Sequence, residues 1–158
     1  MTNTIEKSVE LKAPQSRVWR ALADHREFGA WFGVDFEAPF VAGQTARGRK
    51  LNPCYAHLTF EAVIQKMEPE DYFSFTWRPY AIDPAIDYSN EAPTLVEFRL
   101  EKIAGGTRLT VVESGFDHVP AHRRAEALRM NTKGWEIQMG NIAQFLDGRG
   151  AEQVSDVR

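Results

Sequence analysis

The last part of the chain, residues 120–147, constrains the fold most, because it is one long amphipathic segment that follows mostly strand-like patterns. Its apolar side chains recur at intervals of seven, four, three and four residues, the spacing of one helix face: Leu128, Trp135, Met139, Ile142 and Leu146. A lone helix cannot bury such a stripe on itself, so it needs a sheet that is large enough to pack around it. The sequence therefore predicts an α+β fold with a long C-terminal helix on a sheet.

Two glycines, Gly134 and Gly140, lie inside this helix. Each should cost about 1 kcal/mol relative to alanine in a helix interior. A helix that tolerates this cost needs either a close backbone approach or open space at these positions. The glycines therefore indicate a close-packing point or a pocket.

The rest of the chain predicts one strand, two short helices and then a run of strands. Residues 4–12 alternate between apolar and polar side chains, as expected for a strand with one buried side. Pro14 suits the first turn of the next helix, and a second short helix covers residues 25–32. Further strands are predicted at residues 34–40, 44–51, 56–67, 73–77, 96–100 and 109–113. This order lacks the β-α-β alternation of a parallel doubly wound sheet, so it favours an antiparallel one.

One connection is unusually long. Residues 79–93 are rich in proline and polar side chains, and they predict an irregular loop. Loops of this length inside a compact domain are often functional or mobile.

The composition argues against nucleic-acid binding. The chain has 19 Lys and Arg against 22 Asp and Glu, which gives a formal net charge of −3. Binding to a phosphate backbone needs a strongly basic face instead. We interpret the local basic cluster of Arg47, Arg49 and Lys50 as the solvated face of a strand rather than a phosphate site.

The cysteine and histidine content argues against a metal centre or other cofactor. Cys54 is the only cysteine, which excludes an intramolecular disulfide and a cysteine-based zinc site. The four histidines lack supporting carboxylates at ligand spacing, so no metal is expected.

The first residues show no signal-peptide pattern, and no apolar run approaches the roughly 18 residues that cross a membrane. We expect a cytoplasmic protein with no membrane insertion.

Four short strings occur in order within residues 5–147, nearly the whole chain. They are Ala13-Pro14 with residues 18–22 and Trp31-Phe32, then Phe75-Thr76-Trp77, then Glu113-Ser114-Gly115-Phe116, and finally Gly134-Trp135 with Met139, Ile142 and Leu146. Together these strings resemble the START/Bet v 1-like (SRPBCC) superfamily, and most closely its branch similar to the activator of the Hsp90 ATPase (AHSA1-like).

The resemblance implies a helix-grip fold, in which a curved antiparallel β-sheet wraps the long C-terminal α-helix and two short helices follow the first strand. A single domain would cover residues 1–148, and residues 149–158 would form a disordered tail. Members of the superfamily include lipid carriers, hormone receptors, cyclases and co-chaperones, so the fold does not settle the function.

The predicted inward side of the sheet carries an excess of aromatic residues. Such side chains give a ligand a large apolar contact with few rotors, and methionine adapts to its shape. Plain core packing is the alternative interpretation of the same residues. The candidate ligand-binding walls are Trp31, Phe32, Phe60, Phe75, Trp77, Phe98, Trp135 and Met139, with Arg47 and Glu113 as polar contacts.

Glu113 is the sharpest polar candidate, because it continues the inward face after Leu109 and Val111. A carboxylate there could orient a ligand or accept a proton. It could equally be solvated at the strand end, or paired with an arginine such as Arg47.

Three classes of function follow from the sequence. The first is a binder of a small apolar or aromatic molecule, held between the sheet and the long helix. The second is a protein-interaction module linked to an Hsp90-like chaperone. A homodimer is a possible assembly in any of the three classes. The third is a cyclase-type enzyme with Glu113 as general base.

Overall fold

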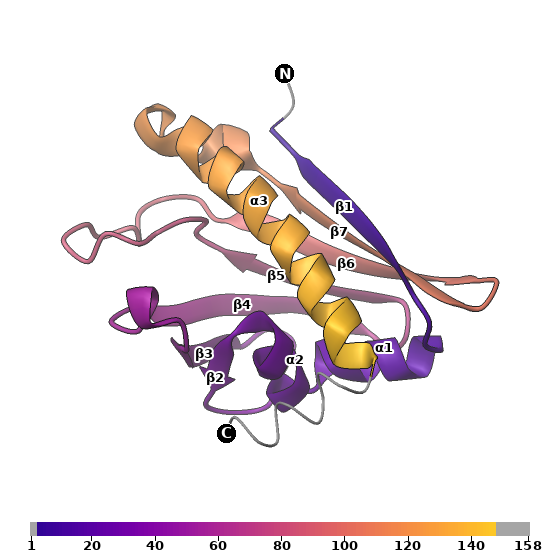
Figure 1. The fold of residues 1–158 in the computed structure, drawn as a ribbon. Helices are drawn as coiled ribbons and strands as arrows, with labels where there is room; N and C mark the ends of the chain where they lie inside the picture. Colours follow the sequence, from indigo (N-terminus) through magenta and orange to yellow (C-terminus); the bar gives the residue numbers. More distant parts are fainter. Residues whose placement is uncertain (1–2, 148–158) are drawn as a thin grey trace.

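A computed structural model describes residues 3–147 of the chain. A seven-stranded antiparallel sheet forms one layer, and a single long helix crosses its inner face (Figure 1). The strands follow the spatial order β1-β7-β6-β5-β4-β3-β2. Their bounds are β1 Ile5–Leu11, β2 Val34–Phe36, β3 Thr45–Lys50, β4 Thr59–Glu68, β5 Tyr72–Trp77, β6 Thr94–Ile103 and β7 Gly106–Ser114.

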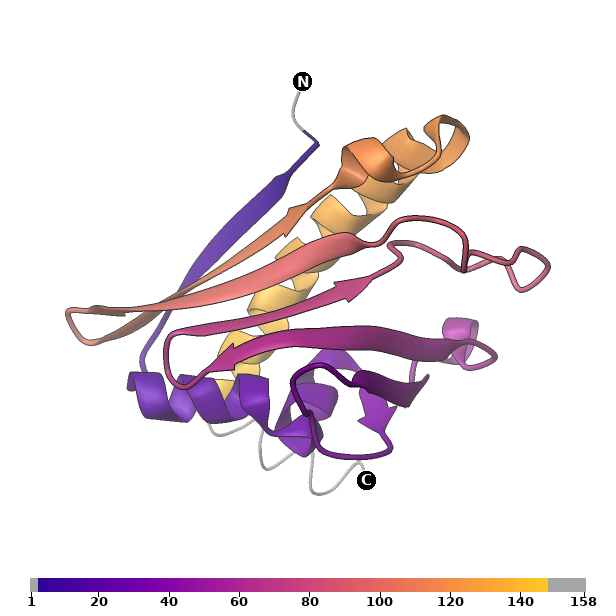
Figure 2. The same ribbon diagram turned by 180° about the vertical axis from the view of Figure 1, so that it is seen from behind.

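The helices lie where the sequence predicts them. They are α1 Gln15–Ala23, α2 His25–Phe32 and α3 Ala121–Leu146, with two single 3-10 turns at η1 Pro53–Tyr55 and η2 Phe116–His118. The view from behind shows the sheet curving around α3, with α1 and α2 at one end (Figure 2). The predicted α+β helix-grip fold is therefore confirmed.

Local capping explains why two short helices form instead of one. The chain leaves α1 at Asp24, whose extended backbone stops the helix. The Asp24 carboxylate then accepts hydrogen bonds from the backbone N–H groups of Arg26 and Glu27 at 2.9 and 3.3 Å. These bonds satisfy two of the free donors at the start of α2. Gly33, with a φ of 94°, ends α2 in the left-handed conformation.

The stripe on α3 is buried as predicted, with one adjustment. Trp135, Met139 and Ile142 are buried, but Leu128 and Leu146 are only partly covered. Their neighbours Ala127 and Phe145 take the fully buried places. Both replacements lie one residue earlier in the chain and on the same side of the predicted stripe, so the buried face is wider on that side than the apolar spacing alone predicts.

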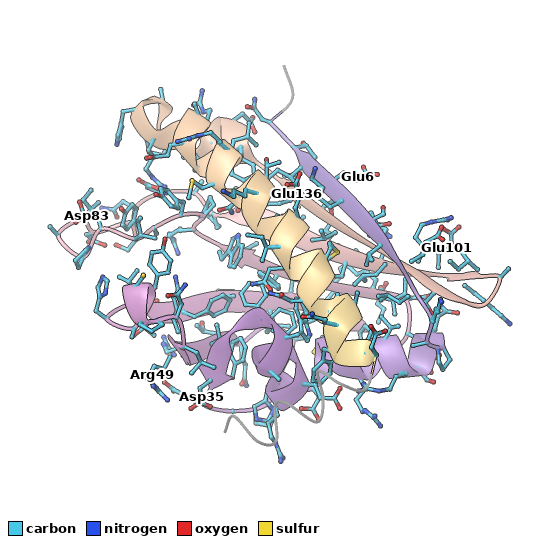
Figure 3. All side chains as sticks on the ribbon, viewed as in Figure 1. Glu6, Asp35, Arg49, Asp83, Glu101 and Glu136 are labelled. Atoms are coloured by element: carbon cyan, nitrogen blue, oxygen red, sulfur yellow. The ribbon has the colours of Figure 1, made fainter. Side chains whose placement is uncertain are left out.

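The outer side of α3 is tied to the edge strand β1. Glu136 lies on the part of α3 that faces β1 (Figure 3), and its carboxylate pairs with the Lys7 ammonium at 2.8 Å.

Within residues 3–147, no helix combines the length and apolar character needed to cross a lipid bilayer. The predicted tail at 149–158 lies outside the described residues.

We expect the helix grip to depend on buried contacts of α3 rather than on its helix propensity. Replacing the fully buried Ile142 with alanine should lower the free energy of unfolding by about 2–5 kcal/mol, through lost apolar contact and a cavity. Urea titration followed by far-ultraviolet circular dichroism measures this change.

Ile137→Ala is the matched control, because Ile137 lies on the same helix with 55% of its surface exposed. It should change the free energy of unfolding by less than about 0.5 kcal/mol. Equal losses in the two variants would show that the sheet does not grip α3 as described.

Candidate functional site

A cavity of about 720 Å³ opens between the middle of α3 and the sheet. The end of α2, the ends of β3 and β5, the start of β4 and the loop 78–93 complete its walls. Specific small-molecule sites usually have volumes of about 300–1,000 Å³, so this cavity can hold a small organic molecule.

Four aromatic side chains from separate elements form one side of the cavity, which we call the aromatic wall. Trp77 of β5 and Trp135 of α3 lie with ring centroids 5.8 Å apart. Phe32 at the end of α2 is 6.0 Å from each of these indoles, and Phe60 of β4 is 5.6 Å from Trp77. The structure thus brings together four of the residues that the sequence predicted as ligand-binding.

Four other predicted wall residues lie behind or beside this wall. Phe75, Phe98 and Met139 are buried in the core and are not among the cavity-lining residues. Phe75 contacts the ring of Trp77, and Phe98 contacts that of Trp135, so both support the wall from behind. Trp31 is also buried, and its indole N–H donates to the carbonyl of Ala21 at 2.8 Å.

Arg47 points away from the cavity. Its neighbours Ala46 and Gly48 take the buried positions of β3, so strand alternation turns Arg47 outward. Its side chain is 52% exposed, and its guanidinium pairs with the Glu61 carboxylate at 2.7 Å. The expected contact between Arg47 and a ligand inside the cavity has no support in this geometry.

Glu113 is fully buried directly behind the aromatic wall. One carboxylate oxygen accepts hydrogen bonds from the indole N–H of Trp77 at 2.7 Å and the hydroxyl of Thr94 at 2.6 Å. The other accepts from the indole N–H of Trp135 at 2.8 Å and the side-chain amide of Asn131 at 3.0 Å. We call these five residues the Glu113 network.

The Glu113 network decides between the environments that the sequence leaves open for this residue, which are solvent, an arginine partner or a dry interior. Glu113 is neither solvated nor paired with Arg47, because its partners are four neutral donors. An ionised carboxylate is an acceptor only, with about four lone-pair sites, so four donors match its capacity. The side chain positions Trp77, Trp135 and Asn131 of the cavity lining and does not itself line the cavity.

The long loop 78–93 forms the outer rim of the cavity and is held against α3. Arg123 of α3, only 10% exposed, makes a two-pronged ion pair with Glu91 of the loop. Its guanidinium also donates to the carbonyl of Pro79 at 2.8 Å and packs over the Tyr88 ring. Tyr80, which lines the cavity, has a φ of 53°, an uncommon backbone for a tyrosine. The loop is therefore a shaped wall of the site, whereas its tip at Asp83 points away from α3 (Figure 3).

Sequence reasoning missed several lining residues that come from irregular segments. Tyr55 belongs to the 3-10 turn after β3, and Tyr80 and Tyr88 belong to the loop. No periodicity marks such residues. Lys50 also lines the cavity, and here a signal existed, since it continues the inward alternation of Ala46 and Gly48.

The two helix glycines have different surroundings. Gly134 lines the cavity, and a Cβ built on it would meet no atom within 4 Å. Gly140 also faces open space, but it lies outside the cavity on the exposed side of α3. Neither glycine is a point of close backbone packing. Only the open space beside Gly134 is part of the cavity.

Within residues 3–147, no three His, Cys, Asp or Glu side chains gather as metal ligands would. The arrangement offers an apolar cavity with polar and charged groups at its rim, and the buried carboxylate of Glu113 already accepts four hydrogen bonds.

The fold and the cavity under the long helix define a helix-grip domain of the START-like, SRPBCC class. The family model described as "Activator of Hsp90 ATPase homolog 1-like protein" matches residues 12–147, and the chain belongs to this family. The AHSA1-like resemblance expected from the sequence is therefore confirmed. No curated protein matches the chain.

Solved structures share the same fold. DynU16, a protein of the dynemicin biosynthetic locus, matches with a TM-score of 0.70 and 25% identity, over 93% of this chain and 48% of its own. This chain therefore spans about half the length of DynU16. Protein MLL2253 from Mesorhizobium loti matches with a TM-score of 0.71 and 24% identity, over 91% of this chain and 96% of its own. The Aha1 dimer from Colwellia psychrerythraea matches with a TM-score of 0.68 and 15% identity, over 90% of this chain and 95% of its own. The last two likenesses show the fold alone.

The Glu113 network leads to a stability prediction. In Glu113→Gln, the amide NH₂ replaces one acceptor oxygen, and the Thr94 hydroxyl or the Asn131 amide can reorient to accommodate it. One indole N–H then loses its acceptor, which should lower the free energy of unfolding by about 1–3 kcal/mol. Urea titration followed by tryptophan emission measures this loss.

The matched control is Glu136→Gln, which removes an exposed ion pair with Lys7. An exposed pair contributes about 0–1 kcal/mol, so this variant should remain close to wild type. If Glu113→Gln were as stable as Glu136→Gln, the carboxylate would not organise the site.

Proposed function

We propose that this protein binds a small apolar or aromatic molecule in the cavity between the sheet and α3. The observation that carries the proposal is the aromatic wall of Trp77, Trp135, Phe32 and Phe60 beside a cavity of about 720 Å³. Indole and phenyl faces offer a flat apolar ligand large contact areas with little loss of rotamer freedom. The ligand would lie against this wall, with the tyrosines of η1 and the loop around it.

Two features that reduce stability support a binding role over plain packing. Gly134 keeps space open at a cost of about 1 kcal/mol relative to alanine in a helix. The Glu113 carboxylate is buried without a cation among the described residues, which is expensive unless every lone pair is satisfied. Both features maintain a defined cavity wall, and a simple hydrophobic core needs neither.

The other two classes of function have weaker support. A chaperone-linked interaction module, acting on an Hsp90-like partner or as a homodimer, is supported by the family's description and by the fold of the Aha1 dimer. The large apolar side chains that are exposed in this chain include Val63 of β4, and Val41 and Ile86, which lie outside the helices and strands. A cyclase-type reaction with Glu113 as general base has less support, because all four acceptor sites of this carboxylate are occupied. A cytoplasmic location remains our prediction.

Filling the space beside Gly134 tests the proposal. Wild-type protein should bind naphthalene-2-methanol, a neutral aromatic probe, saturably and with one site, because the probe can cover the indole faces. Gly134→Leu should weaken this binding at least about tenfold, which corresponds to about 1.4 kcal/mol of lost contact. Tryptophan emission, titrated with the probe, gives both dissociation constants.

Gly140→Leu is the matched control, since it makes the same change in the same helix outside the cavity. Both variants should gain helix stability, by up to about 1 kcal/mol relative to glycine. Gly140→Leu should bind the probe within about twofold of wild type. Non-saturable binding to wild type, or equal affinity in the two variants, would contradict a functional cavity.

A further inference from the structure

One end of the cavity carries an ammonium group that has no carboxylate partner within residues 3–147. Lys50 is the last residue of β3, and the alternation that buries Ala46 and Gly48 turns it inward. Its Nζ lies 5.9 Å from the centre of the Tyr55 ring, which also lines the cavity. Arg47 and Arg49 of the same strand point outward and pair with Glu61 and Asp35.

The charges around the cavity leave a positive excess. Lys50, Arg78 and Lys133 line it, against the carboxylates of Glu61 and Asp87. Glu61 is already paired with Arg47. Arg78 donates to the backbone carbonyls of Ser89 and Glu91, and its charge is partly offset by the nearby Asp87 carboxylate, so Lys50 and Lys133 carry the excess. The cavity is thus cationic in a chain whose formal net charge is −3.

The surroundings of Lys50 make this charge costly in the free protein. Burial lowers the pKa of the Lys50 ammonium from its ordinary value. Desolvation of a charged group is unfavourable unless an opposite charge or hydrogen bonds compensate for it. The ring of Tyr55 compensates only in part, through a cation–π contact.

We propose that the natural ligand is an aromatic or apolar acid, whose carboxylate binds the Lys50 ammonium while its apolar body covers the aromatic wall. This proposal rests on the proposed binding function and adds the ligand's charge and orientation. Lys133 at the α3 side of the cavity adds to the attraction, and Lys50 makes the direct contact.

Two probes of the same shape separate the two proposals. Naphthalene-2-carboxylate and naphthalene-2-methanol share the aromatic body and differ in charge. Isothermal titration calorimetry at neutral pH and low salt should show that wild-type protein binds the carboxylate about tenfold more tightly, the size of one charge-assisted hydrogen bond. Added salt should reduce this preference.

Lys50→Met keeps the length of the apolar stem and removes the charge. It should lose most of the preference for the carboxylate and bind naphthalene-2-methanol within about twofold of wild type. Lys66→Met is the control, because Lys66 is an exposed lysine of β4 outside the cavity. It should keep the full preference.

A stability measurement excludes misfolding as the cause. The folded-state pKa of Lys50 lies below its unfolded value, so at neutral pH the folded protein is disfavoured by holding this ammonium. Lys50→Met should therefore unfold at an equal or higher urea concentration than wild type.

The affinities of the two probes distinguish failure of the acid proposal from failure of the cavity proposal. Tight binding of both probes with no preference in wild type, or an equal loss of both in Lys50→Met, would overturn the proposed acid while leaving the cavity function intact. Failure of both probes to bind wild type would overturn the cavity function, and the acid with it.

Discussion

The buried carboxylate of Glu113 is the interaction on which the rest of the site depends. It joins β5, β6, β7 and α3 through four hydrogen bonds. These bonds fix the position of α3 along the sheet and the rotation of α3 about its own axis. Two of its donors are the indoles of the aromatic wall, Trp77 and Trp135. Removing one carboxylate oxygen would leave a buried N–H group without an acceptor, which costs free energy of folding. The network therefore tolerates little change at Glu113.

The cavity follows from this arrangement. With Trp77 and Trp135 held from behind, Trp77 is partly exposed to the cavity, whereas Trp135 lines it with only 2% of its surface exposed. Phe75 and Phe98 support the two indoles from the core. Gly134 removes the side chain that would otherwise fill the space, and the Arg123–Glu91 pair holds the long loop as a rim. Lys50 then gives the cavity a charged end.

The sequence predicts those parts of the site that regular periodicity governs. The stripe around Trp135 locates the helix, and strand alternation correctly turns Phe60, Trp77 and Glu113 inward. Alternation cannot tell which inward residues reach a cavity, so it predicts Phe75 and Phe98 as wall residues although they lie in the core. The tyrosines of η1 and the loop could not be predicted, because their positions depend on tertiary contacts such as the Arg123–Glu91 pair. The alternation of Ala46 and Gly48 with Arg47 does indicate that Lys50 points inward, which contradicts the interpretation of the basic cluster as a single solvated face.

A ligand bound in the cavity should lie against the two indoles that Glu113 holds. The most direct measurement is a ¹H–¹⁵N spectrum of the four tryptophan indole N–H groups during titration with naphthalene-2-methanol, with each signal assigned from its Trp→Phe variant. We expect the Trp77 and Trp135 signals to shift together and saturably, with much smaller changes at Trp19 and Trp31. Shifts confined to Trp19 or Trp31, or no saturable shift at any indole, would contradict this binding mode.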